Sequence, residues 1–335
     1  MPESITRRGA LAAVARGAAA AGLGAALIPS AASAAAPVVS RGRTKVVILG
    51  SLGGQQLTQL AGAASRCGSS VLIDVDGELT LVDCGCGSAH RVVEAGYDLD
   101  AVRNVLVTHY HVDHVADLAS VATLAWSSGR NGVDPRRRLD IYGPTGTIAY
   151  QRGVSRALGI SIADQQGALG QRPPFDRYAR WHELEPPRRA RKVFEGSRLD
   201  VHALRVNHGG VPAVGYRIRT PDLDLVFSGD RGARGDGFAS LSKGADALFH
   251  EVLDRATVLP VLKAQGVAKT FIRHLVNDHC DPRAVGRVAS RADVGNLVLY
   301  HLIPGNLAVT DEAWREKVRP YYGGQVVVAR DLLVV

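Results

Sequence analysis

One heptapeptide concentrates side chains that bind transition metals. The segment 108–114 reads Thr-His-Tyr-His-Val-Asp-His and follows directly on a short buried-strand pattern. Imidazole nitrogens and carboxylate oxygens are ligands of borderline metals such as Zn²⁺. Because a loop can direct alternate side chains toward one point, we expect His109 and His111 to bind one ion. Asp113 and His114 then reach a second ion. The pattern therefore predicts a two-metal site at the carboxyl end of a strand.

The elements that must position this loop alternate along the chain without internal repeats. Apolar runs that end at turn residues predict strands, and Asp76-Gly77 favours a tight hairpin turn between two of them. Apolar residues at helical spacing predict helices. Strands are predicted at 45–50, 71–75, 78–83, 104–107, 139–143, 199–206, 213–219, 223–228, 246–250, 296–301 and 325–329, and helices at about 88–96, 117–126, 256–265, 282–291 and 311–318. Hairpins mixed with strand–helix units predict the α/β (α+β) class, with two mixed sheets flanked by helices in an αββα layering.

The segment 159–191 is predicted to be irregular because it is rich in Pro and Arg. One interpretation is a solvated surface insertion. The other is a basic flap over a site, which would reach an anionic substrate. We favour the surface insertion.

The first 34 residues form a separate predicted segment. Arg7-Arg8 precedes a mildly apolar Ala/Gly/Leu stretch, and Ala32-Ser33-Ala34 fits a signal-peptidase site. The segment resembles a twin-arginine export signal. A membrane anchor would need about 20 strongly apolar residues, and Arg16 interrupts this run. We therefore expect a signal at 1–34, a linker at 35–44 and one domain at 45–335. The protein would be a periplasmic or secreted client of the twin-arginine machinery, without stable membrane insertion; the alternative is a disordered tail.

Composition narrows the class of protein. The 335 residues are 46% hydrophobic and 21% charged, which excludes collagen-like, disordered and coiled-coil chains. Four cysteines are too few for a small disulfide scaffold, although Cys67 and Cys84 could pair after export. The formal charge of +8 is compatible with an anionic partner.

At 109–114 the chain resembles the metallo-β-lactamase superfamily, whose signature is His-x-His-x-Asp-His. Further superfamily motifs occur in the expected order at Asp83 (Leu-Val-Asp-Cys-Gly), His208 (Val-Asn-His-Gly-Gly), Asp230 (Phe-Ser-Gly-Asp) and His301 (Leu-Val-Leu-Tyr-His-Leu). The resemblance covers about 45–335 and implies the metallo-β-lactamase sandwich fold. It also implies two Zn²⁺ ions per chain, with iron or manganese as alternatives.

The resemblance assigns a role to each of these residues. Asp83 would support the ligand loop, and His208 would be the third ligand of the first metal. Asp230 would bridge both metals, and His301 would be the last ligand of the second. Asp113 is expected to serve in catalysis as well as in metal binding.

Two further motifs resemble the ribonuclease Z-like branch, which includes arylsulfatase and phosphodiesterase relatives. They are Phe-His-Glu-Val at Glu251 and Asp-His-Cys-Asp-Pro at His279. The resemblance implies that Glu251 orients His279, and that His279 donates to a developing oxyanion or leaving oxygen. His250 is expected to be a core residue. The histidines without motif context are expected to be structural or at the surface: His90, His182, His202 and His274.

Two departures separate the chain from the tRNA-processing members of this branch. Those enzymes carry a long substrate-gripping arm between the equivalents of His208 and Asp230, which here are only 22 positions apart. Cys280 replaces the usual Thr or Ser after the histidine. Together with export, these differences lead us to disfavour nucleic acid as a partner.

Three functions are compatible with the sequence. The first, which we favour, is an exported dinuclear hydrolase in which a hydroxide shared by the metals cleaves a small ester-containing or anionic substrate: a phosphodiester, sulfate ester or lactone. The second is a ribonuclease Z-like nuclease or phosphodiesterase acting on nucleic acid. The third is a non-catalytic metal-binding member, although all seven expected ligands are present. A homodimer remains open.

Overall fold

The computed structural model describes residues 38–55, 66–128, 137–168, 173–196, 198–234, 237–305 and 309–335. All of them belong to one compact unit, 37–335. The predicted signal at 1–34 and the start of the linker at 35–44 lie outside the described residues, so those boundaries stay predictions. Within the described ranges, no helix combines the length and the apolar character needed to span a membrane.

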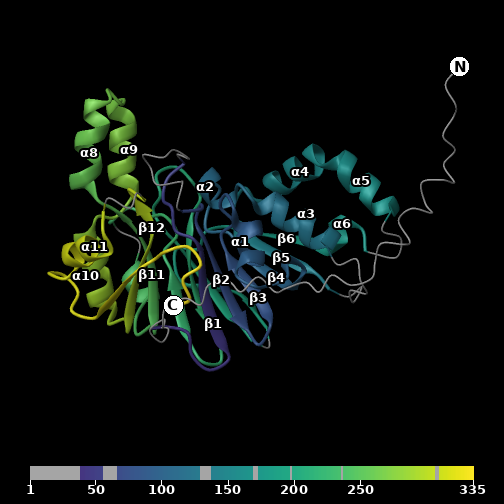
Figure 1. Cartoon of the computed structure of the whole chain (residues 1–335), viewed down its shortest axis with the longest axis horizontal. Helices are drawn as coiled ribbons and strands as arrows, with labels where there is room; N and C mark the ends of the chain where they lie inside the picture. Colours follow the sequence, from purple (N-terminus) through teal and green to yellow (C-terminus); the bar gives the residue numbers. More distant parts are fainter. Residues whose placement is uncertain are drawn as a thin grey trace, which may run out of the picture. The chain divides into compact units, whose positions relative to one another are not determined.

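The first sheet has six strands in the order β1-β2-β3-β4-β5-β6 (Figure 1). Its strands are β1 (Thr44–Gly50), β2 (Ser70–Val75), β3 (Glu78–Val82), β4 (Val102–Leu106), β5 (Leu139–Pro144) and β6 (Ala179–Leu184). The pairs from β1 to β3 are antiparallel, and those from β3 to β6 are parallel. Asp76 and Gly77 both adopt positive φ, of 50° and 80°, in the β2–β3 turn. This is the backbone that the Asp-Gly pair predicts for a tight hairpin.

The second sheet has seven strands in the order β13-β12-β11-β10-β9-β8-β7. Its strands are β7 (Arg191–Glu195), β8 (Asp200–Arg205), β9 (Val214–Arg219), β10 (Asp224–Phe227), β11 (Ala247–Leu253), β12 (Asn296–Ile303) and β13 (Gln325–Val328). Pairing is antiparallel from β7 to β10 and parallel from β10 to β13. Both sheets are therefore mixed, as the sequence predicts.

Helices cover the outer faces of the two sheets (Figure 1). The helices that follow strands of the first sheet are α1 (Ser88–Glu94), a 3₁₀ turn η1 (Leu99–Ala101), α2 (Val112–Val115), α3 (Leu118–Ser128), α4 (Thr147–Ala157), α5 (Gly159–Ala168) and α6 (Phe175–Tyr178). Those that follow strands of the second sheet are α7 (Phe238–Leu241), α8 (Arg255–Ala264), α9 (Lys269–Asp278), α10 (Pro282–Ala292) and α11 (Asp311–Val318).

Side-chain alternation in the strands produces the layers. In β1, Val46 and Ile48 point into the core between the two sheets, which also contains Phe227 and Phe249. Val47 of the same strand belongs to a second core, formed with α1 and α3. A third core lies between the second sheet and α7, α10 and α11. Because the central strands bury both faces, they read as continuous apolar runs, and the predicted αββα layering is confirmed.

The prediction of an irregular segment at 159–191 is wrong. It contains α5, α6 and β6, and it ends at the first residue of β7. Thus it supplies the edge strand of the first sheet and begins that of the second. Edge strands are exposed and tolerate charge, so β6 and β7 lack the apolar runs that mark the central strands. The helices α4 and α9 were also not predicted.

Candidate metal centre

The metal-binding heptapeptide lies where β4 ends. Its loop continues into the short helix α2, and His109 and His114 are fully buried. The loop is held from the neighbouring strand end by Asp83. One oxygen of this carboxylate accepts from the Thr108 backbone N–H at 2.7 Å, and the other accepts from the Thr108 hydroxyl at 2.8 Å. Asp83 follows β3 and Thr108 lies just after β4. The parallel pairing of these two strands therefore sets the position of the loop.

The first group of candidate ligands brings together three imidazoles and one carboxylate: His109, His111, His208 and Asp230. His111 Nδ1 lies 3.1 Å from His109 Nε2 and 3.0 Å from His208 Nε2. Asp230 Oδ2 is 3.8 Å from the Nε2 atoms of both His109 and His208. Three imidazole nitrogens that converge in this way form a set of metal ligands.

The second group contains two imidazoles and two carboxylates: Asp113, His114, Asp230 and His301. Asp230 Oδ1 lies 3.3 Å from His114 Nε2 and 3.3 Å from His301 Nε2. His301 Nε2 also lies 3.2 Å from Asp113 Oδ2. One oxygen of Asp230 thus faces each group, which is the arrangement of a bridging carboxylate.

Supporting hydrogen bonds orient the candidate ligands. His114 Nδ1 donates to Asp83 Oδ2 at 2.8 Å, and His208 Nδ1 donates to the Asp278 carbonyl oxygen at 3.0 Å. In both rings this leaves Nε2 facing the site. Asp83 and His301 adopt positive φ, of 60° and 48°. Non-glycine residues in this strained region cluster at functional sites, where the surroundings hold them in place.

The two groups differ in their electrostatics. Burial lowers the pKa values of His109, His111 and His208, the last to about 4, so these imidazoles are neutral at neutral pH. Burial also disfavours the charged form of His114, but the three carboxylates around it outweigh burial and raise its pKa. The second group therefore carries negative charge that a cation would balance.

Buried polar atoms at the centre match the needs of a metal. Among the described residues, Asp113 Oδ1, His114 Nε2 and Asp230 Oδ1 are buried and make no hydrogen bond. Buried polar groups are nearly always satisfied, and coordination to a divalent ion would satisfy these three. A mixed nitrogen and oxygen donor set suits Zn²⁺, with iron and manganese also compatible.

Glu251 and His279 form a buried pair beside the two groups. His279 Nδ1 donates to Glu251 Oε2 at 3.2 Å, and the Cys280 backbone N–H donates to Glu251 Oε1 at 2.7 Å. The His279 ring stacks against the His301 ring, with centroids 5.7 Å apart. Burial opposes the charged form of His279, yet the Glu251 carboxylate, together with Asp230 and Asp113, outweighs burial and raises the pKa of His279 to about 9. His279 is therefore protonated at neutral pH.

The family of the chain follows from a match of residues 80–302 to the family model described as "Beta-lactamase superfamily domain". This range is well over half of the chain and contains nearly all of the candidate centre. The chain belongs to the metallo-β-lactamase superfamily. Its fold implies binding of divalent metal, in agreement with the ligand groups described above.

Relatives of this metallo-β-lactamase chain carry the name ribonuclease Z. The protein of Mycobacterium bovis (strain BCG / Pasteur 1173P2) is 28% identical over 271 residues, covering 80% of this chain and 91% of the relative. That of Mycobacterium avium (strain 104) is 29% identical over 273 residues, with the same coverage of both.

Solved structures show the same fold. Human tRNase Z, short form, superposes with a TM-score of 0.62 at 21% identity, covering 87% of this chain and 98% of that one. The metallo-β-lactamase fold protein YhfI from Bacillus subtilis also gives 0.62, at 20% identity and with the same coverage of both chains.

The expectation that nucleic acid is disfavoured as a partner is wrong. Relatives that align along 80% of this metallo-β-lactamase chain are ribonucleases Z. The short segment between His208 and Asp230 does not by itself exclude a nucleic acid, because elements that grip a substrate can come from elsewhere in a chain.

His274, which the sequence predicts to be structural or at the surface, is exposed but also lies near the centre. His274 lies on α9, and its ring centroid is 6.3 Å from that of His111 and 6.4 Å from that of His208. Its Nδ1 is 2.6 Å from Asp278 Oδ2. A usable signal was its position four residues before Asp278, one helical turn ahead of the Asp-His-Cys-Asp-Pro motif. By contrast, His250 is fully buried and contacts Arg231 at 3.2 Å, as expected for a core residue.

The cysteines of this chain are free thiols. Cys84 is fully buried in the core behind the first sheet, whereas the Cys67 sulfur accepts from Arg91 Nε at 3.3 Å. The disulfide between Cys67 and Cys84 that the sequence left open is therefore not formed.

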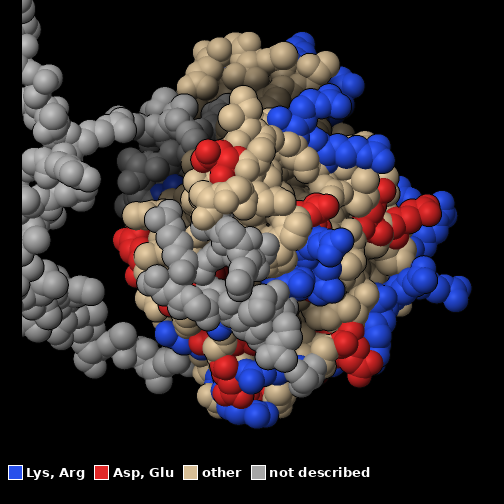
Figure 2. All heavy atoms as spheres, turned by 90° about the vertical axis from the view of Figure 1, so that its right-hand side faces the viewer, with Lys and Arg blue, Asp and Glu red and all other residues tan. Residues whose placement is uncertain are grey.

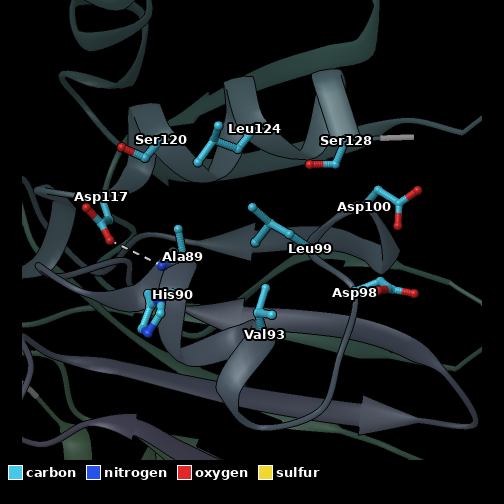
Figure 3. A pocket seen from close by; sticks show the side chains of 10 residues that line it. All are labelled: Ala89, His90, Val93, Asp98, Leu99, Asp100, Asp117, Ser120, Leu124 and Ser128. Carbon is cyan, nitrogen blue, oxygen red and sulfur yellow. Dashed lines mark hydrogen bonds between the residues drawn. The ribbon is translucent and has the colours of Figure 1, made fainter. Parts of the chain in front are cut away.

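A separate pocket of about 710 Å³ lies between α1, η1 and α3 (Figure 3). Its lining contains Asp98, Asp100 and Asp117, and no candidate ligand. The Asp117 carboxylate accepts from the Ala89 backbone N–H at 3.2 Å, so it is used in joining α1 to the loop before α3. This pocket plays no part in the centre.

Proposed function

We propose that the chain is a metal-dependent phosphodiester hydrolase of the ribonuclease Z type, acting on RNA and holding two Zn²⁺ ions. The observation that carries the proposal is Asp230, whose two carboxylate oxygens each face a separate group of ligands. Similarity to ribonucleases Z over 80% of the chain supports the choice of substrate class.

The chain's own residues perform three tasks in this reaction. Bound divalent ions supply an activated water at neutral pH and neutralise charge on the phosphoryl oxygens. Asp83 and Thr108 hold the ligand loop so that its donors converge. His279, protonated by virtue of its pKa of about 9, donates a proton to the leaving oxygen. Glu251 positions that imidazole by accepting from its Nδ1.

A second candidate is hydrolysis of a small phosphodiester. The observation that favours it is the short segment between His208 and Asp230, which contains only the β9–β10 hairpin. A short hairpin leaves this side of the centre without an extended element to grip a large substrate.

A substrate panel tests the proposal. The metal-loaded chain is assayed on single-stranded RNA, bis(p-nitrophenyl) phosphate, a cyclic nucleotide, an aryl sulfate, an acyl lactone and a β-lactam, with His114→Ala as the inactive control. We expect RNA and the aryl diester to be cleaved. Cleavage of small diesters without RNA would favour the second candidate. Cleavage of the sulfate or lactone without any phosphodiester would contradict both.

We also propose that the chain is exported through its first 34 residues. Arg7-Arg8 and the Ala-Ser-Ala end carry this proposal. A fusion of residues 1–44 to a reporter that is active only outside the cytoplasm tests it. Replacement of both arginines with lysine is expected to abolish export, because the arginine pair is the recognised feature. Equal export of both fusions would contradict the proposal.

A further inference from the structure

A pair of helices stands beside the metal centre and belongs to neither helix layer. The helices α8 and α9 are inserted between Glu251 at the end of β11 and His279. In Figure 1 they lie side by side and extend beyond the ends of the strands, above α10 and α11. We call residues 255–278 the α8–α9 hairpin.

The hairpin is attached to the domain only at its base. None of the residues of α8 is buried, and α9 buries only Leu275 and Asp278. Leu275 packs with Leu253 and Ile303 in a small separate cluster. Arg255 closes the base by donating to the carbonyl oxygens of Val276 and His279. The rest of the hairpin contributes little to the core, so folding alone does not explain its presence.

The hairpin is basic apart from Asp278 at its base, whose Oδ2 lies 2.6 Å from His274 Nδ1. Between Arg255 and Asn277 the sequence contains four Lys or Arg and no Asp or Glu. Lys263, Lys269 and Arg273 are exposed, and none of them forms an ion pair within the described part of the chain. Elsewhere the charges are mixed: on the face shown in Figure 2, Asp and Glu lie among the Lys and Arg that gather along its right-hand side. The hairpin is thus suited to a polyanion.

A line of rings connects the hairpin to the metal centre. Phe271 is 43% exposed, and its ring centroid lies 6.5 Å from that of His274, one turn further along α9. The His274 ring in turn lies 6.3 Å from that of His111. The rings of Phe271, His274 and His111 therefore form a row from the exposed surface to a candidate ligand. Lys269 and Arg273 lie on the same helix as the first two rings.

We propose that the α8–α9 hairpin binds the single-stranded RNA segment next to the scissile phosphodiester, with bases against Phe271 and His274 and phosphates near Lys269 and Arg273. The inference deepens the proposed function and rests on it for the identity of the substrate. Proteins that bind single strands combine cationic side chains that follow the backbone with aromatic rings on which bases stack. The hairpin offers both, and it leads to the place where the strand would be cut.

Binding can be measured apart from cleavage. In a His114→Ala background, a labelled single-stranded oligoribonucleotide is titrated with the full chain by fluorescence anisotropy. Lys269→Glu with Arg273→Glu is expected to raise Kd more than tenfold. It is also expected to reduce the slope of log Kd against log salt by about 0.7 for each phosphate that the variant no longer neutralises. Phe271→Leu, which keeps bulk but removes the ring, is expected to weaken binding roughly tenfold, and Phe271→Tyr to restore it.

The matched control is Arg188→Glu with Arg189→Glu, which changes the net charge equally on the exposed loop before β7. We expect this control to bind RNA like its parent. If both charge-reversal variants weakened RNA binding equally, net charge alone would explain the effect and the proposal would be overturned. Unchanged RNA binding in the hairpin variant would also overturn it. It would also be overturned if the parent bound anionic lipid vesicles but not RNA, or if the hairpin variant changed only the oligomeric state.

The outcome separates this inference from the proposed function. In the otherwise native chain, the hairpin variants are expected to lower the ratio of kcat/KM for RNA to kcat/KM for bis(p-nitrophenyl) phosphate. A chain that binds RNA through the hairpin but cleaves no phosphodiester contradicts the proposed function and leaves the inference standing. If the native chain cleaves RNA but the hairpin variants leave the ratio of the two kcat/KM values unchanged, the proposed function stands and the inference about the hairpin is contradicted.

Discussion

At the scale of single residues, the centre depends on which atom of each side chain faces inward. Asp230 presents one oxygen to each ligand group, and the Nδ1 atoms of His114 and His208 are occupied by hydrogen bonds to Asp83 and Asp278. Such supporting bonds fix the tautomer and orientation of a ligand before the metal arrives. The centre is therefore largely pre-formed by the chain.

Removal of a ligand from the second group should remove one metal and the reaction with it. Asp113→Ala and His114→Ala are each expected to lower bound metal below two ions per chain and to reduce phosphodiester hydrolysis at least about 100-fold, because two-metal chemistry needs both ions. Metal content is measured by elemental analysis of the purified protein. His90→Ala, at an exposed position outside both groups, is the control. Full activity in either ligand variant would contradict the dinuclear centre.

Loss of His279 should affect substrates according to their leaving groups. His279→Ala is expected to reduce kcat about 10²- to 10⁴-fold on diesters with alcohol leaving groups, since these need a proton as they depart. The loss is expected to be much smaller on bis(p-nitrophenyl) phosphate, whose leaving group is already stable as an anion. His202→Ala, in β8 and outside both ligand groups, is the comparison. Equal losses on both substrates would show that His279 is not a proton donor.

At the scale of elements, the candidate ligands are positioned by the ends of strands, and His279 is positioned by the start of a helix. The ligand loop begins where β4 ends, Asp230 follows β10, and His301 lies near the carboxyl end of β12. His279 is positioned by the start of α10, whose N-cap Asp281 follows two residues later. There Asp281 accepts from the Ala284 backbone N–H at 2.9 Å, and Pro282 occupies the first helical turn. This cap couples the stability of α10 to the position of His279.

Removal of that cap should therefore affect both stability and turnover. Asp281→Ala is expected to lower the free energy of unfolding by about 1 kcal/mol and to reduce kcat. Thr310→Ala removes the equivalent cap of α11, where the Thr310 hydroxyl accepts from Ala313 at 3.1 Å. It is expected to destabilise by a similar amount without loss of turnover. Urea unfolding and initial rates measure the two effects, and equal kcat in both variants would uncouple α10 from the centre.

At the scale of the whole molecule, the two sheets are held together by one apolar layer. Phe227 and Phe249 stack within it, with centroids 4.5 Å apart and both rings fully buried. These residues lie on neighbouring strands of the second sheet and face the first. Because ligands come from both sheets, this layer sets the distance between the two halves of the centre.

Truncation in this layer should be strongly destabilising. Phe227→Ala is expected to lower the free energy of unfolding by about 3–5 kcal/mol, since it leaves a cavity in a packed core. Phe271→Ala, at a half-exposed site on the hairpin, is expected to change it by less than about 0.5 kcal/mol. Urea unfolding followed by circular dichroism compares the two, and similar stabilities would contradict the assignment of Phe227 to the core.

The sequence predicted those features of the fold and the site that are determined within a short segment of the chain. The central strands and the αββα layering were predictable because strands buried on both faces read as apolar runs. The edge strands β6 and β7 were not, since their exposed faces carry charge. The clustering of His109, His111, Asp113 and His114 is likewise local, because a six-residue loop brings them together wherever it lies.

The sequence by itself therefore determined the layers, the ligand loop and, through motif resemblance, the remaining candidate ligands. The resemblance also predicted that Asp230 serves both groups and that Glu251 orients His279. Only the tertiary structure decided which oxygen of Asp230 faces which group, which atoms join Glu251 to His279, and that His274 lies beside His111. It also decided that the α8–α9 hairpin stands next to the centre. The physical reason is that periodicity reports which face of a segment is buried. It does not report which strand ends meet, because strand order and register are set by pairing between residues far apart in the chain.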